Sequence, residues 1–182
     1  YGEPTPFAYP AVSSQFGAMD LCGYPKDFYY YYKSWWTEED VLHIFPHWNG
    51  TPGEKRDMYV FSNCPEVELF VNGVSQGRKQ MERDGYLVWE NVVFQPGCVS
   101  ALGYRDGREV LREEVHTPGC GEKLRLSVSY SEGDIKIICA DILDSAGRVA
   151  VDACPEIVFQ VSGGRILGTS NGDPSDHALP AG

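Results

Sequence analysis

The sequence lacks two features that would assign it to a membrane or to nucleic acid. No apolar run reaches the roughly 18 residues that a membrane-spanning helix needs. The 15 Lys and Arg residues are scattered among 26 Asp and Glu residues, which gives a formal net charge of −11. Because nucleic-acid binding depends on clustered Lys and Arg, we expect no nucleic-acid partner and no membrane span. A neutral partner such as a sugar suits this composition better.

Closely spaced metal or disulfide ligands are also missing. The 6 cysteines stand far apart without a Cys-x-x-Cys pair, which is poor spacing for zinc and for a small disulfide scaffold. We therefore expect separate, buried thiols, no metal and no cofactor. His43, His47 and Trp48 lie close in the sequence but have no carboxylate pair beside them, so a structural role is favoured over metal binding.

Residues 1–36 are instead rich in proline and aromatic residues. Pro4 and Pro6 restrict their own backbone and that of the preceding residues, which predicts an irregular start. The aromatic run 28–36 follows Asp27 and predicts a helix capped by that residue, although the aromatic content also permits a strand. Helical spacing would place four aromatic residues on one face: Phe28, Tyr31, Tyr32 and Trp35. Core packing is favoured over a carbohydrate platform for this cluster.

From about residue 41 the pattern becomes β. Asn72-Gly73 and Asp106-Gly107 supply the positive-φ residues of tight hairpin turns. Alternation predicts one inward face made of Leu87, Trp89, Asn91 and Val93. Seven strands with turns at short intervals predict a β-sandwich. The predicted strands cover residues 41–45, 58–62, 66–71, 74–79, 86–94, 99–104 and 109–115.

A linker at residues 117–119 precedes a second β region. Strands are predicted at residues 124–130, 134–143, 157–161 and 166–168. A sheet of so few strands has only marginal stability by itself. We therefore expect a second sandwich that is cut short at its C-terminus.

Three stretches carry a resemblance to a known family. They are GEPTPF with PAVSSQFG (residues 2–7 and 10–17), GYPKD running to SWW (23–36), and HIFPHWN (43–49). CPEVELFVNG (64–73) and ILGTSNGDP (166–174) extend it. Together they resemble glycoside hydrolase family 2, particularly its bacterial β-galactosidases. The resemblance implies a mainly β fold, with immunoglobulin-like β-sandwich domains preceded by the last loop and helix of a catalytic (β/α)8 barrel.

The resemblance also implies a domain division and a function. Residues 1–40 would end the barrel, residues 41–118 would form one immunoglobulin-like sandwich, and residues 119–182 a second, truncated one. The parent would be a retaining enzyme that hydrolyses terminal β-D-galactosides with two carboxyl groups about 5–5.5 Å apart. The chain is expected to be a piece of a longer protein, with both catalytic glutamates upstream of Tyr1. It is therefore predicted to be inactive alone. The expected partners are a β-galactoside oligosaccharide or polysaccharide, the rest of the barrel, and a second copy in a homo-oligomer.

The same resemblance places one rim of the sugar pocket near the N-terminus. The rim residues it implies are Glu3, Phe7, Tyr9, Ser13, Ser14 and Phe16. Glu3 would make a polar contact near the sugar or anchor its loop, and the aromatic residues would stack on a sugar or pack on the barrel. Two alternatives stay open: a non-catalytic carbohydrate-binding or adhesion module, and a parent with β-glucuronidase or β-mannosidase specificity.

Overall fold

The computed structural model describes residues 16–20 and 23–171, and this part of the chain is mainly β, as predicted. It contains α1 (Asp27–Trp36), β1 (Leu42–Phe45), β2 (Lys55–Ser62), β3 (Glu66–Val71), β4 (Val74–Gln80), β5 (Leu87–Val93), β6 (Cys98–Arg105), β7 (Arg108–His116), β8 (Lys123–Glu132) and β9 (Ile135–Leu143). Among these residues no helix has the length and apolar character needed to cross a membrane.

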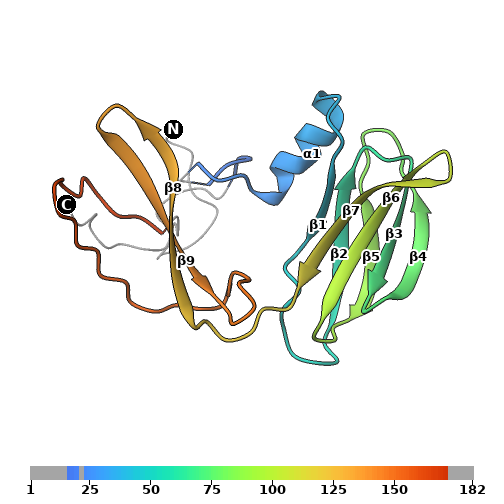
Figure 1. Ribbon diagram of the computed structural model, residues 1–182. Coiled ribbons are helices and arrows are strands. Elements are labelled where there is room, and N and C mark those ends of the chain that lie inside the picture. The colour runs from blue at the N-terminus through green and yellow to red at the C-terminus, as the bar shows by residue number, and fades with distance from the viewer. Residues whose placement is uncertain (1–15, 21–22, 172–182) are drawn as a thin grey trace.

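Strands β1 to β7 form the predicted sandwich of two antiparallel sheets (Figure 1). One sheet has the order β1-β2-β5 and the other the order β4-β3-β6-β7. The core between them contains fully buried Trp48, Phe94, Met58 and Leu69. The indole nitrogen of Trp48 donates to the carbonyl of Gln95 at 3.0 Å, so the largest core side chain leaves no polar atom unsatisfied.

Strand β3 shows why this sequence builds the sheet. Val67, Leu69 and Val71 are buried while the residues between them face outward, which is the period of two that a half-buried strand requires. Asn72 and Gly73 follow with φ angles of 49° and 80° and turn the chain directly into β4, as predicted.

The predicted alternation along β5 fails at Asn91. Leu87 and Trp89 are buried as expected, but Asn91 and Val93 are exposed. Asn91 has a φ of 55°, its N–H donates to Asp57 Oδ1 at 2.9 Å, and the pairing of β2 with β5 changes register beside it. This bulge inserts one residue, so the following side chains exchange faces and Val92 is buried instead.

The predicted helix is confirmed as α1, but the cap assigned to Asp27 is wrong. Lys26 occupies the N-cap position without a side-chain cap bond, and Asp27 is the first helical residue. The helix lies against the outer face of the three-stranded sheet (Figure 1). There the Phe61 ring, only 1% exposed, contacts the rings of Phe28 and Tyr31 at centroid distances of 5.5 and 5.4 Å.

Strands β8 and β9 pair as an antiparallel hairpin after the linker. Three β8 side chains that alternate with polar ones are apolar and exposed on one face: Leu124, Leu126 and Val128. Tyr130 is exposed as well, but a register shift before it moves it to the other face. The strands predicted at residues 157–161 and 166–168 are wrong, because these residues are described without strand structure. This apolar face therefore lacks a packed second layer within the described part of the chain.

The buried carboxylate of Asp144 ties the linker to the turn after β9. It accepts hydrogen bonds from the N–H groups of Gly119, Arg148 and Ala146 at 2.8, 2.8 and 2.9 Å. These bonds lower the pKa of the Asp144 carboxyl, the Gly119 bond most, because they stabilise the charged form.

The expectation that the cysteines are all buried is wrong. Cys64 is buried, but Cys98 and Cys139 are only partly covered and Cys120 and Cys154 are exposed. All five are free thiols, and Cys22 lies outside the described residues.

Close packing of Gly103 against Cys64 gives a test of this fold. A Cβ on Gly103 would lie 2.6 Å from Cys64 Sγ and 3.4 Å from the Cβ of Leu111. Gly103→Ala is therefore expected to lower the free energy of unfolding by about 1–3 kcal/mol, as overpacked cores do. Urea denaturation measures this change.

The double variant Gly103→Ala/Cys64→Ala removes the clashing sulfur and should be more stable than the sum of the two single variants implies. Gly164→Ala is the matched control, because its Cβ would meet only a Val161 methyl group at 3.7 Å. Additive losses in the double variant would contradict the proposed clash.

Candidate functional site

The sugar-pocket rim expected from the resemblance falls almost entirely on residues that are not described. Glu3, Phe7, Tyr9, Ser13 and Ser14 lie outside the described residues. Phe16 is described and is 70% exposed, next to a segment in which Met19 bridges to Pro25. The rim therefore stays a prediction.

Helix α1 divides its aromatic residues between two faces. Of the four residues predicted to share one face, Phe28, Tyr31 and Trp35 contact the sandwich, and Tyr32 is the exception. Tyr31 and Trp35 turn toward the sandwich and donate hydrogen bonds to the carbonyls of Asp84 and Gly85 at 2.7 and 3.2 Å. Tyr32 instead stacks on Trp36 at 4.8 Å, and Trp36 is 78% exposed. Phe28 and Tyr29 are exposed as well. We call Tyr29, Tyr32 and Trp36 the outer aromatic face of α1.

His43 connects the helix to both sheets. Its Nε2 lies 2.9 Å from Asp27 Oδ1 in α1, and its Nδ1 lies 3.5 Å from Glu113 Oε1 in β7. The other oxygen of Glu113 accepts the N–H of Ile44 at 2.6 Å. Burial alone would lower the pKa of His43, but hydrogen bonds and charge from Asp27 and Glu113 raise it to about 9.

The structural role predicted for His43 thus fits its contacts, but the premise that it has no nearby carboxylate pair is wrong. Sequence reasoning missed the pair because Asp27 and Glu113 belong to distant segments. Trp48 lies in the core, as described above, and His47 is exposed.

A row of rings extends from His43 along the three-stranded sheet. Tyr30 stacks on His43 at 3.9 Å, His43 lies 6.0 Å from Phe45, and Phe45 stacks on Tyr59 at 5.1 Å. All four rings are partly exposed, and Tyr86 continues the row at 6.3 Å from Tyr59. Such a strip offers a flat apolar surface to a sugar ring or to another protein surface.

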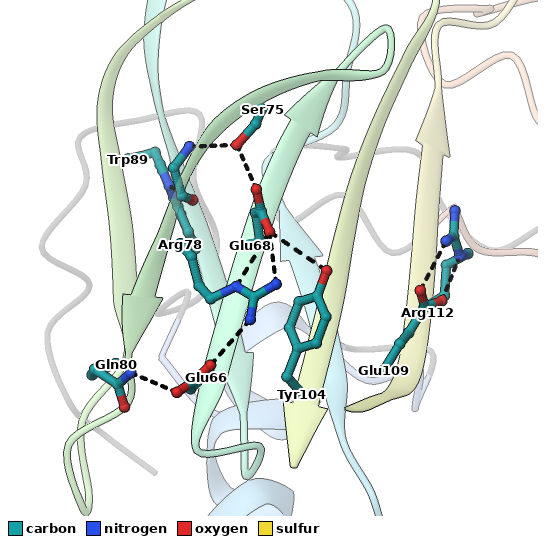
Figure 2. A network of polar contacts seen from close by, with 10 residues as sticks. Glu66, Glu68, Ser75, Arg78, Gln80, Trp89, Tyr104, Glu109 and Arg112 are labelled. Carbon is teal, nitrogen blue, oxygen red and sulfur yellow. Dashed lines mark hydrogen bonds and ion pairs between the residues drawn. The ribbon is translucent and has the colours of Figure 1, made fainter. Parts of the chain in front are cut away.

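The opposite sheet carries a polar network on its outer face (Figure 2). The Arg78 guanidinium contacts Glu68 at 3.1 Å and Glu66 at 3.3 Å, and lies 3.6 Å from the centre of the Tyr104 ring. The Ser75 hydroxyl donates to the other oxygen of Glu68 at 2.6 Å. The two carboxylates therefore have their charges and lone pairs engaged by neighbours.

This network lacks the chemistry of a glycosidase acid–base pair. Hydrogen bonds from Gln80 and Arg78 lower the pKa of Glu66, and those from Ser75 and Arg78 lower the pKa of Glu68. A general acid in glycoside hydrolysis needs the opposite shift. In the described ranges, each carboxyl group with a shifted pKa has it lowered: Glu54, Glu66, Glu68 and Asp144.

A third cluster, which the sequence did not predict, lies where β6 and β7 meet the linker. Cys98, Glu114 and His116 place one potential ligand atom each within 4.8 Å of one another. Glu114 Oε2 lies 3.3 Å from His116 Nε2. Glu114 and His116 also line a cavity of about 310 Å³. Burial, the largest effect, and nearby Glu114 raise the pKa of the Cys98 thiol.

Comparison with known proteins gives this arrangement a context. Residues 53–111 match a domain of unknown function, DUF4982. The chain is 44% identical over 180 residues to β-galactosidase BoGH2A of Bacteroides ovatus, a match that covers 95% of this chain and 21% of that protein.

Solved structures agree with this relationship. A β-glycosidase from Bacteroides vulgatus superposes with a TM-score of 0.85 at 32% identity, covering 94% of this chain and 23% of that one. A β-glucuronidase from glycoside hydrolase family 2 superposes with a TM-score of 0.65 at 30% identity, covering 73% of this chain and 15% of that one. The chain thus spans about a fifth of the length of the relatives that it matches.

The shifted pKa of His43 predicts a pH-dependent stability. Because this pKa is raised from 6.5 to about 9 on folding, the stabilisation is complete below pH 6.5 and is lost as the pH rises through 9. With the discount for half-exposed Asp27, its size should be on the order of 1–2 kcal/mol.

Urea denaturation of the wild type and His43→Gln between pH 6 and 10 measures this difference, which should be largest at low pH. His47→Gln is the matched control, since His47 is exposed, and it should show no such trend. A wild-type advantage that grows toward pH 10 would contradict the assignment.

Proposed function

The chain matches a segment of family 2 glycoside hydrolases, and from this premise we propose that it is the C-terminal portion of a retaining β-galactosidase-type enzyme. In this proposal residues 1–40 end the catalytic barrel, and residues 41–118 and 119–182 form accessory sandwich domains. The catalytic glutamates belong to the preceding part of the parent, so the chain alone does not turn over substrate.

The similarity to a β-galactosidase and a β-glycosidase along nearly the whole chain carries this proposal. It extends across α1, the sandwich and the hairpin together, which favours one inherited assembly over a separate binding module. The lowered pKa values of Glu66 and Glu68 support the view that the chain lacks a glycosidase acid of its own.

The composition of the proposed rim favours a galactoside over a glucuronide. A glucuronide carries a carboxylate, and proteins recognise carboxylates with Arg or Lys. No Arg or Lys occurs before Lys26, whereas Glu3 supplies a negative charge. The wall that this chain contributes therefore suits a neutral sugar, with β-glucuronidase specificity as the alternative.

The outer aromatic face of α1 supports a contact with the rest of the barrel. One side of the helix already contacts Phe61 and the turn before β5, so Tyr29, Tyr32 and Trp36 remain to pack on a second partner. A helix with apolar residues on both sides is typical of one buried between two layers. The β8–β9 face would be covered in the same way by further strands of the second sandwich.

A non-catalytic carbohydrate-binding module is the second candidate. The ring row of Tyr30, Phe45 and Tyr59 favours it, because partly exposed rings can stack on sugars. Tight binding of a polysaccharide by this chain, abolished in Tyr59→Ala, would support that candidate.

Substrate specificity is tested on the parent enzyme with chromogenic β-galactoside and β-glucuronide. We expect kcat/KM to be higher for the galactoside. Glu3→Gln should raise the ratio of glucuronide to galactoside turnover by about tenfold or more, because it removes a like charge from the rim. Glu38→Gln, which changes an exposed carboxylate after α1, is the matched control.

A parent that prefers the glucuronide would overturn the proposed specificity. Hydrolysis of the galactoside by the 182-residue chain alone would overturn the proposed position of the catalytic glutamates.

The contact of α1 with the barrel predicts self-association of the isolated chain. Exposed apolar surface of this kind drives association, so sedimentation should show concentration-dependent oligomers that Trp36→Glu reduces. In the parent the same substitution should lower the free energy of unfolding by roughly 2–4 kcal/mol, because it buries a charge. Glu38→Gln again serves as the control, and equal effects of both substitutions would count against the contact.

A further inference from the structure

The end of the β6–β7 ladder brings three different ligand types onto one face of the sheet. Cys98 and His116 are direct cross-strand partners, and Glu114 is two residues before His116, on the same side of β7. Their ligand atoms are a sulfur, a nitrogen and an oxygen within 4.8 Å of one another. We propose that Cys98, Glu114 and His116 bind a divalent transition-metal ion of the zinc class.

The separations suit tetrahedral coordination. Zinc bonds of about 2.3 Å to sulfur and 2.0–2.2 Å to nitrogen and oxygen imply ligand separations of about 3.4–3.6 Å. The 3.3 Å between Glu114 Oε2 and His116 Nε2 is already close to this value. The Cys98 sulfur lies within 4.8 Å of both partner atoms, and we infer that its side chain adjusts to this separation when the ion binds. The fourth position remains open to water.

The ligand types also select the ion. Thiolate and imidazole favour zinc-class metals, whereas Mg²⁺ and Ca²⁺ need shells made mostly of oxygen. A thiolate and a carboxylate together balance the two positive charges of the ion. Binding displaces the proton of the Cys98 thiol to solvent.

Hydrogen bonds fix the backbone at Cys98 and next to His116. The Cys98 N–H donates to Asn72 Oδ1 at 2.8 Å, and beyond His116 the Thr117 N–H donates to the carbonyl of Gly97 at 2.8 Å. These bonds fix the register of the two ligand-bearing strand ends.

A row of side chains along β7 orients the carboxylate. Glu109 holds Arg112 through two hydrogen bonds of 2.9 and 3.1 Å (Figure 2). Arg112 in turn lies 3.8 Å from Glu114 Oε1, which leaves Oε2 directed at His116.

Cobalt titration of the reduced, metal-free chain tests the site. We expect a thiolate-to-cobalt charge-transfer band and tetrahedral ligand-field bands that saturate at one ion per chain. Cys98→Ser should abolish the charge-transfer band, and Cys120→Ser, which alters an exposed thiol elsewhere, should leave it unchanged. Glu114→Gln and His116→Ala should each weaken zinc affinity, measured by competition, roughly tenfold or more.

Thermal unfolding in the presence of zinc is a second test that does not depend on the cobalt absorption bands. Zinc should raise the melting temperature of the wild type and of Cys120→Ser, but not of Cys98→Ser. If Cys98→Ser is unfolded without metal, the comparison uses Glu114→Gln, whose side chain is exposed. Absence of the charge-transfer band in the wild type, or its persistence in Cys98→Ser, would overturn the proposal.

Discussion

Coverage of sheet faces is the constraint on which the rest of this structure depends. Each antiparallel sheet has two faces, and an apolar face stays out of water only when another layer packs on it. The inner faces of the sandwich cover each other around Trp48 and Phe94. The outer face of the three-stranded sheet carries Phe61, whose ring is buried beneath α1 and beside the rings of Phe45 and Tyr86. The apolar Phe61 ring thus favours the docking of α1 at this position on the sheet.

Hydrogen bonds and opposite charges then stabilise the docking of α1 on the three-stranded sheet. His43 lies under the helix with a carboxylate on each ring nitrogen, so one side chain links α1, β1 and β7. The outer face of the four-stranded sheet is kept compatible with water in a different way. This face is polar, and Arg78 lies between Glu66, Glu68 and Tyr104, so that sheet needs no further layer. Within the described residues, the apolar β8–β9 face is neither polar nor covered by a second layer. For this reason we propose that further strands cover it.

Features set by neighbouring residues were predictable from the sequence, and features set by register were not. The Asn72-Gly73 turn and the strand at residues 66–71 depend on local backbone preference, and both predictions are confirmed. The face of β5 was predicted incorrectly because Asn91 adopts a positive φ, which a side-chain pattern does not reveal. Asp27 resembled a helix cap by its position, yet its carboxylate is used by His43, a residue that only the folded chain brings near.

The cluster of Cys98, Glu114 and His116 shows the same limit most clearly. Counting back from the Asp106-Gly107 turn, with Arg105 opposite Arg108, pairs Cys98 with Val115 and gives no metal-binding pattern. A register shift between Gly103 and Tyr104 moves the pairing by one residue and places His116 opposite Cys98. A one-residue shift exchanges the faces of the side chains that follow it, so this bulge at Val110 in β7 decides which residues meet at the end of the ladder. Ligands brought together in this way leave no spacing motif in the sequence.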